Sequence, residues 1–397
     1  RTEVKQRGVS IGQLNPSKRP DYDQVLMNGN VAICLGAMHA GVDFYAGYPI
    51  SPATSILVWM EKNLPAPNKF VHQVSSEIEA ITALVGAGFA GKKPMTATAG
   101  PGFSLMSEGL GLGWMAEIPL VVVDVQRGGP ATGLPTKTEQ SDLMSTMFPA
   151  HGDIRLPVIA PGSVEECFHG AVAAVNWAER YQGPVILLSE MALSERNQNL
   201  RKPDLSKVPV ENRDVNQNTN GYQRYDHSDV SPMPIPGGPG SYVANGSEHD
   251  GIGDTTHLAE RHVQMTHRRW NKIKVLEDGD FEVDSIDSPI ALVPWGGTKG
   301  PTREAYNKLI ESGADIAWVY TMFLNPLPPQ MLETLRQKEL VLVPELNYQG
   351  QFSMILRSLG VNAISITQYT GLPFKVKDLV ERVNQQIESY KQGHKKV

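Results

Sequence analysis

Two segments restrict the fold of this chain more than any other feature, LVVVDV (residues 120–125) and VILLS (residues 185–189). Both are apolar at nearly every position, without the alternation that marks a strand with one face in water. Strands buried on both faces belong to parallel sheets that helices cover on both sides. Strand and helix patterns alternate at short intervals over residues 28–195, as such a sheet requires. The sequence therefore predicts a doubly wound α/β domain over these residues.

The order of the expected elements also indicates where a ligand would bind. In parallel sheets, ligands lie beyond the carboxyl ends of the strands. The loops after FYAG, TATA and VVVDV follow such ends and are the expected location of any chemistry. The expected strands span residues 42–47, 69–74, 94–99, 119–125 and 183–189, and the expected helices span residues 30–40, 52–61, 77–90, 103–115 and 163–180.

Residues 196–285 have a different character, with many prolines and glycines and few strand patterns. So long an irregular segment is either a disordered linker or an ordered arm that packs over the first domain or a partner. Apolar anchors favour the ordered arm: Tyr222, Tyr225, Met233, Ile235 and Tyr242. The arm also contains histidines whose spacing fits no metal-binding motif, and we interpret them as surface residues of a helix over residues 255–270: His249, His257, His262 and His267.

Residues 286–397 form a second expected α/β domain, with strands over residues 290–297, 316–322, 339–346 and 361–369. Its expected helices span residues 299–313, 328–338, 350–360 and a last amphipathic stretch through residue 390. The loops WGGTKGP (295–301) and PELNYQGQ (344–351) follow strand ends. They contain no set of acid, base and nucleophile, so contact with a partner or another copy is favoured over a separate catalytic site.

Composition excludes several classes of protein. A net charge of −6 gives no reason to expect nucleic acid or an anionic membrane as a partner, and no apolar run suggests a membrane span. Two cysteines, Cys34 and Cys167, cannot hold a four-iron cluster, which needs about four thiolates. They suit a reducing cytoplasm. The polar residues 1–27 begin with Arg1 and are interpreted as a linker truncated from an upstream domain.

Glu77 is the acid at the centre of the functional argument. It opens an apolar helix within VSSEIEAITALVGAGFAGKKPMTATAGPGFS (residues 74–104), and Ser75 or Ser76 can cap that helix. The helix dipole tolerates a negative charge at this position, whereas burial of a carboxyl group favours its protonated form. The alternative is an acid that only caps the helix, which is common in a first turn.

Four loops of the first domain have unusual composition and can converge on one edge of the sheet, over residues 47–55, 75–80, 98–106 and 126–142. In the first loop, prolines flank Ser51 and leave its hydroxyl displayed just before a helix, where anions bind. In the last loop, Arg127 ends an apolar strand and its guanidinium suits a carboxylate. The glycines of that loop let the backbone approach a ligand: Gly128, Gly129 and Gly133.

These motifs resemble a known family. GYPISPAT resembles the YPITP motif of the 2-oxoacid:ferredoxin oxidoreductases, and TATAGPGFSLM with QRGGPATGLPTKTEQSD resembles their alpha subunit of the 2-oxoglutarate type. PELNYQGQ and TGLPF also fit, so the resemblance covers residues 29–374. It implies a pyrimidine-type thiamine-diphosphate-binding domain followed by a transketolase C-terminal-like domain.

The resemblance also implies cofactors and partners. It implies thiamine diphosphate, coenzyme A and ferredoxin, with a beta subunit that carries Mg²⁺, the cofactor's diphosphate and a 4Fe-4S cluster. An (alpha-beta)2 assembly with an upstream gamma domain is expected. The diphosphate signature, GDG followed by paired asparagines, is absent from the sequence, and DGD at residues 278–280 lacks the asparagines. This chain would therefore supply half of a cofactor site.

The family implies a role for each candidate residue. Glu77 matches the acid that pairs with ring N1′ of the aminopyrimidine, so that the cofactor's own imino group removes the C2 proton. Arg127 would bind the carboxylate of the 2-oxoacid, Ser51 and Thr132 would donate hydrogen bonds, and Lys137 is a candidate for a distal carboxylate. The wall beside the cofactor would consist of Gly100, Pro101, Gly102 and Phe103.

Two positions depart from the family pattern. Ser51 replaces the threonine of YPITP, and SSE at residues 75–77 replaces EDE, so only the last acid matches. The predicted activity is oxidative decarboxylation of 2-oxoglutarate with coenzyme A to succinyl-CoA, CO2 and reduced ferredoxin, which in reverse would fix CO2 in a reductive TCA cycle. The same chemistry on pyruvate or another 2-oxoacid is one alternative, and a non-catalytic scaffold subunit is another.

Overall fold

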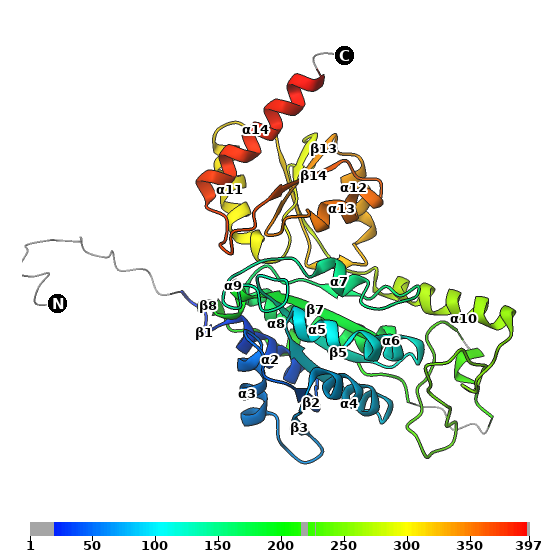
Figure 1. The fold of residues 1–397 in the computed structure, drawn as a ribbon. Helices are drawn as coiled ribbons and strands as arrows, with labels where there is room; N and C mark the ends of the chain where they lie inside the picture. The colour runs from blue at the N-terminus through cyan, green and yellow to red at the C-terminus, as the bar shows by residue number, and fades with distance from the viewer. Residues whose placement is uncertain (1–19, 216–220, 227, 395–397) are drawn as a thin grey trace, which may run out of the picture.

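The computed structural model describes residues 20–215, 221–226 and 228–394 of the chain. These residues form two α/β units, with the first below the second in Figure 1. An extended arm that includes helix α10 (Ala259–Asn271) runs along the first unit.

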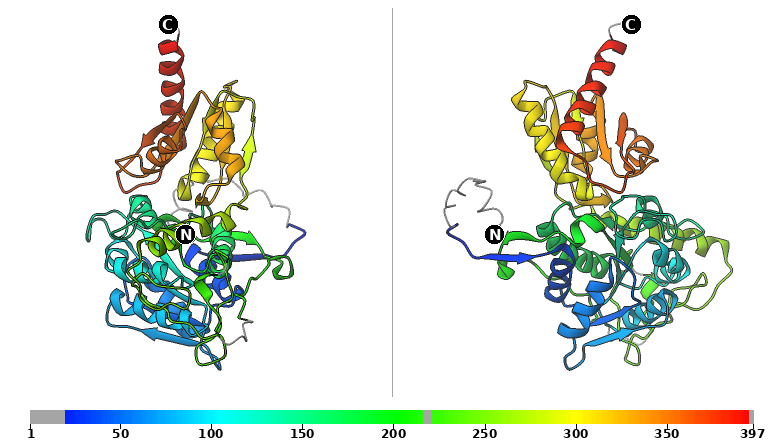
Figure 2. Two further views of the ribbon diagram at one scale, coloured as in Figure 1. Left: turned by 90° about the vertical axis from the view of Figure 1, so that its right-hand side faces the viewer. Right: turned by 60° about the vertical axis from the view of Figure 1, so that its left-hand side comes forward.

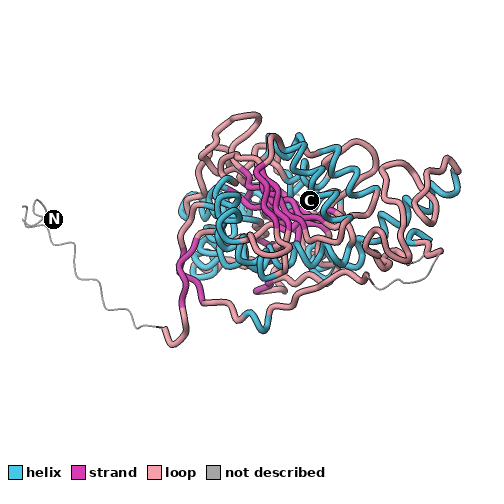
Figure 3. The backbone as a smooth tube through the Cα atoms, turned by 90° about the horizontal axis from the view of Figure 1, so that it is seen from below, coloured by secondary structure: helices cyan, strands magenta, loops and turns pink. Residues whose placement is uncertain are grey.

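A seven-stranded sheet lies at the centre of the first unit, in the order β12-β6-β7-β5-β4-β2-β3. Every neighbouring pair is parallel except β12 with β6. Figure 3 shows strands enclosed by helices, which confirms the doubly wound prediction. The strands are β2 (Phe44–Gly47), β3 (Phe70–Gln73), β4 (Pro94–Thr98), β5 (Leu120–Gln126), β6 (Val158–Ile159), β7 (Pro184–Glu190) and β12 (Phe323–Asn325).

The two faces of this sheet carry different helices. Strand β5 directs Val121, Val123 and Val125 to one core and Leu120 and Val122 to the other. One face is covered by α2 (Gly29–His39), α3 (Thr54–Asn63) and α8 (Val164–Tyr181). The other is covered by α4 (Glu77–Phe89), α5 (Gly100–Leu105), α6 (Ser107–Met115) and α7 (Leu143–Met147).

Several short elements differ from the sequence prediction. The helix expected over residues 103–115 is two helices, α5 and α6, which meet at Met106. Strands β1 (Gln24–Met27) and β8 (Gln198–Arg201), both in segments expected to be linkers, pair with each other antiparallel. Strand β6, helix α7 and helix α9 (Met191–Ser194) are too short for a periodic pattern to reveal them.

The second unit contains a five-stranded sheet in the order β14-β13-β10-β11-β9. In Figure 2 its last helix, α14 (Val376–His394), projects away from the first unit. The boundary expected at residues 285/286 does not separate the two sheets. Strand β9 precedes it but pairs with β11 of the second sheet, and β12 follows it but pairs with β6 of the first sheet. The remaining elements are β9 (Glu282–Asp284), β10 (Ile290–Leu292), β11 (Ala317–Tyr320), β13 (Leu340–Glu345), β14 (Ala363–Thr367), α11 (Lys299–Glu311), α12 (Pro329–Arg336) and α13 (Gln351–Ser358).

The arm is ordered over its described residues, and buried charge holds it to the first unit. Glu117, between α6 and β5, is completely buried and accepts a hydrogen bond from Arg268 Nε at 2.8 Å and one from Lys272 Nζ at 3.0 Å. Arg224 Nη2 lies 4.0 Å from the same carboxylate. Burial alone would raise the pKa of Glu117, but Lys272, Arg268 and Arg224 together lower it well below its usual range.

The histidines of the arm are not all surface residues of one helix. His249 and His257 precede α10, and His249 is buried with its ring 4.2 Å from that of Tyr225. Residues 259–271 form the helix expected over residues 255–270. No group of metal-ligating side chains occurs among the residues that the structure describes, and none of their helices is long and apolar enough to cross a membrane.

Candidate functional site

Glu77 is the first residue of α4 and is only 5% exposed. The cap of this helix is Ser76, whose hydroxyl accepts from the backbone N–H of Glu79 at 3.3 Å. Glu79 in turn accepts from the Ser75 backbone N–H at 2.7 Å. The helix is therefore capped without Glu77, whose carboxylate has no hydrogen bond or ion pair within the described part of the chain.

The expected cofactor wall lies directly against this carboxylate. Residues Gly100 to Phe103 begin α5, just beyond the carboxyl end of β4. A Cβ atom added at Gly102 would collide with Glu77 Oε1 and with Thr98 Oγ1. Only glycine therefore allows α5 to approach the acid so closely, and the prediction that these two loops converge is confirmed.

Arg127 and Ser51 are also in contact, although through the backbone of Ser51. Arg127 follows β5 and is 8% exposed, and its Nη1 donates to the Ser51 carbonyl oxygen at 2.6 Å. Its Nε is buried with no hydrogen-bond partner among the described residues. A buried guanidinium with a free donor can bind an incoming anion.

Thr132 and Lys137 lie on an exposed loop that begins at Arg127. The Gly128 N–H donates to the Lys137 carbonyl at 3.0 Å, which closes the loop at its base. Neither side chain has a hydrogen bond or ion pair to any residue that the structure places. The structure thus brings Glu77 together with Gly102, and Arg127 together with Ser51. The side chains of Thr132 and Lys137 remain exposed to solvent.

Two buried aspartates near the site were not predicted. Asp124 on β5 is fully buried, and neither of its carboxylate oxygens has a hydrogen-bond partner within the described residues. Burial, with Asp142 nearby, raises the pKa of Asp124 well above its usual range. Asp142 lies against Gly100, and burial and Glu139 raise its pKa while Arg127 lowers it. An acid within the otherwise apolar LVVVDV was the available signal.

Glu190 was also missed, because it ends a strand whose apolar residues dominate the pattern. It is fully buried at the end of β7 and accepts hydrogen bonds from Thr138 Oγ1 at 3.2 Å and from the Gly297 N–H at 3.2 Å. Burial raises the pKa of Glu190 to about 7, although hydrogen bonds from Gly297, Thr138 and Gln140 lower it. The second unit therefore reaches the edge of the first sheet.

The loops WGGTKGP and PELNYQGQ contact this same edge. Trp295 O accepts from Gln140 Nε2 at 2.9 Å, and Asn347 Nδ2 donates to Gln140 O at 3.0 Å. The partner that these loops meet in this chain is the first unit itself. A contact with another protein at these loops stays a prediction.

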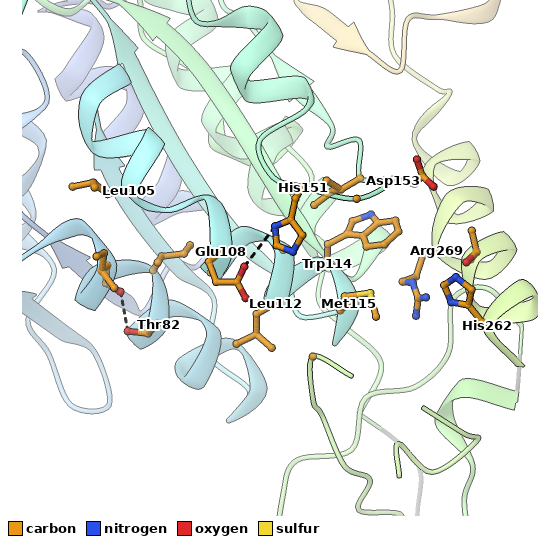
Figure 4. A pocket seen from close by; sticks show the side chains of 18 residues that line it. Thr82, Leu105, Glu108, Leu112, Trp114, Met115, His151, Asp153, His262 and Arg269 are labelled. Atoms are coloured by element: carbon orange, nitrogen blue, oxygen red, sulfur yellow. Dashed lines mark hydrogen bonds and ion pairs between the residues drawn. The ribbon is translucent and has the colours of Figure 1, made fainter. Parts of the chain in front are cut away.

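Two cavities lie near the candidate residues. One of about 860 Å³ is lined by Ser51, Trp59, Lys62 and Thr136 among others, beside α3. The other, of about 650 Å³, lies between α4, α6 and α10 and is drawn in Figure 4, where Glu108 faces His151 and Trp114 lies near Arg269. Its lining includes neither Glu77 nor Arg127, so it is not the candidate site.

Fold and site together define an α/β protein that presents a buried carboxyl and a buried guanidinium at the carboxyl edge of a parallel sheet. The chain belongs to the pyruvate flavodoxin/ferredoxin oxidoreductase family with a thiamine-diphosphate-binding domain, whose model matches residues 35–268.

Its relatives are alpha-type subunits. The chain is 36% identical over 380 residues to the 2-oxoglutarate oxidoreductase subunit KorA of Mycobacterium tuberculosis, covering 92% of this chain and 58% of the relative. It is 36% identical over 324 residues to the 2-oxoglutarate synthase subunit KorA of Methanocaldococcus jannaschii, covering 81% of this chain and 88% of the relative. These relatives confirm the resemblance to the alpha subunit of the 2-oxoglutarate type.

Two solved structures are similar to this chain in fold. The 2-oxoglutarate:ferredoxin oxidoreductase of Magnetococcus marinus, solved with 2-oxoglutarate, coenzyme A and succinyl-CoA bound, superposes with a TM-score of 0.90 and 35% identity, covering 97% of this chain and 69% of that one. A split-gene transketolase in an inactive beta4 tetramer shares the fold at a TM-score of 0.52 and 13% identity, over 90% of this chain and 97% of that one. The predicted fold class is confirmed.

Proposed function

We propose that this chain is the alpha subunit of a thiamine-diphosphate-dependent 2-oxoglutarate:ferredoxin oxidoreductase. The reaction would convert 2-oxoglutarate and coenzyme A to succinyl-CoA and CO2 and would pass electrons to ferredoxin. The observation that carries the proposal is Glu77, a buried acid at the start of α4 whose carboxylate lies against Gly102 and has no other partner in the described residues.

These residues fit the pyrimidine half of thiamine diphosphate. A carboxyl group without an internal partner is available to a ring nitrogen. When bound, thiamine diphosphate supplies the electron sink for loss of CO2 from a 2-oxoacid. Glu77 would hold a proton at the pyrimidine ring, and the wall would be Gly100, Pro101, Gly102 and Phe103.

The residues near Arg127 fit the substrate. Its buried Nε, free among the described residues, suits the carboxylate next to the keto group. Ser51 and Thr132 would add hydroxyl donors, and Lys137, exposed on the same loop, would reach a distal carboxylate. All of these roles belong to the proposal.

Other parts of the enzyme would come from partner proteins. Mg²⁺ and a 4Fe-4S cluster would be held by a beta subunit. The described residues contain no group of metal-ligating side chains, and the two cysteines of the chain are both buried. We propose an (alpha-beta)2 assembly with an upstream gamma domain, ferredoxin as electron acceptor and coenzyme A as co-substrate. Buried free cysteines suit a cytoplasmic location.

The direct test is co-expression with a beta subunit followed by an assay of ferredoxin reduction. Reduction that requires both 2-oxoglutarate and coenzyme A would support the proposal. Initial rates that are faster with pyruvate or a branched 2-oxoacid than with 2-oxoglutarate would show that the substrate is that other 2-oxoacid. Unchanged thiamine diphosphate affinity in Glu77→Gln and Arg127→Ala variants, with no turnover in wild type, would favour a scaffold.

A further inference from the structure

Gln140 makes four hydrogen bonds to the second unit, and its side chain also hydrogen-bonds Glu190 of the first unit. Its backbone N–H donates to the Leu346 carbonyl at 2.7 Å, and its carbonyl accepts from Asn347 Nδ2 at 3.0 Å. Its side-chain Nε2 donates to the Trp295 carbonyl at 2.9 Å, while Oε1 accepts from the Leu346 N–H at 3.0 Å. The residue is completely buried, so each of these bonds is costly to break.

Residues on either side of Gln140 make further contacts with the same unit. Ser141 O accepts from Gln351 Nε2 at 2.7 Å. Thr138 reaches the second unit through Glu190, which also accepts the Gly297 N–H. A Cβ atom at Gly297 would collide with Glu190 Oε1, so glycine is needed for that approach. The segment 138–141 is therefore fixed at several points.

The loop that ends at this segment carries three candidate substrate residues. Arg127 begins the loop directly after β5, and the bond between Gly128 and Lys137 closes its base. The first end of the loop is held by the sheet. The second end is held by the second unit through Gln140, three residues after Lys137. A Cβ atom added at Gly371 of the second unit would lie 2.9 Å from Lys137 Cβ, so the two backbones are close.

We propose that Gln140 is a positioning residue, which fixes the loop Arg127–Lys137 on the second unit and so determines where Thr132 and Lys137 meet the substrate. The part that concerns the substrate rests on the proposed function. The second unit then contributes to recognition of the 2-oxoacid without touching it. Glu77 begins α4, a different helix from the elements that this attachment holds.

Gln140→Met tests the proposal because it keeps the side-chain volume and removes both side-chain bonds to the second unit, together with the bond to Glu190. In the enzyme assembled with its beta subunit, the KM for 2-oxoglutarate should rise about tenfold, with kcat and thiamine diphosphate affinity within about twofold of wild type. The matched control is Gln337→Met at the exposed residue that caps the C-terminus of α12. The Gln337 Nε2 donates to Glu333 Oε1 at 3.3 Å. This control should leave all three values unchanged.

A second measurement does not depend on the activity. Hydrogen–deuterium exchange of the chain should increase over residues 128–137 in Gln140→Met and stay at the wild-type level over residues 77–89. Exchange that is unchanged in the loop, or that rises equally in both segments, would overturn the proposal. So would an unchanged KM, or a thiamine diphosphate affinity that falls in step with it. If wild type turns over no 2-oxoacid, the proposed function fails and the exchange data still decide the role of Gln140.

Discussion

Glu77 and Glu117 are buried glutamates of the same domain with opposite surroundings. Glu117 is enclosed by Arg224, Arg268 and Lys272, and all three cations come from the arm. Glu77 has no ion pair or hydrogen bond within the described residues and lies beside the backbone of Gly102. Burial alone therefore does not identify a functional acid.

The difference lies in what the protein provides to each carboxylate. A buried ion that is paired and hydrogen-bonded holds structure together, and the loss of one partner is costly. A buried carboxyl without internal partners costs folding free energy and remains available to a ligand. The comparison predicts that Glu77 matters for activity and Glu117 for stability.

The largest effect is expected for Glu77→Gln. The amide keeps the shape but cannot hold the proton at the pyrimidine ring, so kcat should fall by about two to four orders of magnitude. The free energy of unfolding should stay at or above the wild-type value, because no internal partner is lost and burial of an unpartnered carboxyl is costly. Steady-state kinetics and urea unfolding measure the two quantities.

Glu79→Gln is the control, since Glu79 lies in the same first turn, is exposed, and accepts two hydrogen bonds from Ser75 through its carboxylate. Similar turnover in the two variants would remove the special role of Glu77.

Glu117→Gln should act in the opposite sense. It leaves three buried cations without a full negative charge, so the free energy of unfolding should fall by about 3–5 kcal/mol. Because the folded-state pKa is lowered, the stabilisation from Glu117 is present above about pH 4.5 and is lost as the pH falls. Urea unfolding at pH 7 and pH 4 checks both statements. Glu333→Gln, an exposed partner of Arg336, should change stability by less than about 0.5 kcal/mol.

Glu190 is an intermediate case, with three neutral hydrogen-bond donors, Gly297, Thr138 and Gln140, and no cation among its partners in the described residues. Its folded-state pKa of about 7 lies above the unfolded value of about 4.5, so its contribution to stability is full below about pH 4.5 and is lost as the pH rises through 7. Wild type should lose up to about 1.4 kcal/mol per pH unit within this window because of this group.

Glu190→Gln should flatten that dependence in urea unfolding between pH 5 and pH 8. Glu195→Gln, five residues on and exposed, should keep the wild-type slope. If the free energy of unfolding had the same pH dependence in all three proteins, Glu190 would not be the group that causes it.

Much of this arrangement could be predicted from the sequence. Apolar runs identified most strands of both sheets, although β6, β9 and β12 were missed. Glu77 and Arg127 stood out because a polar residue at the end of an apolar segment is visible in one sequence. Glu117, Gln140 and Glu190 could not be found in this way. Their partners lie 151, 155 and 107 positions away in Arg268, Trp295 and Gly297, so only the tertiary fold brings the groups together.

Arg127 and Arg268 extend the comparison to the cations, with the smallest expected effect. Arg268 binds Glu117 through two nitrogens, whereas Arg127 keeps a buried Nε free within the described residues. Lysine retains the charge at either position but cannot form the planar two-point contact. Arg127→Lys should therefore raise the KM for 2-oxoglutarate about tenfold with little change in stability, while Arg268→Lys should lower the melting temperature with little change in KM. Steady-state kinetics and thermal unfolding of both variants measure these two effects. A KM that rises only in Arg268→Lys would place the substrate anion away from Arg127.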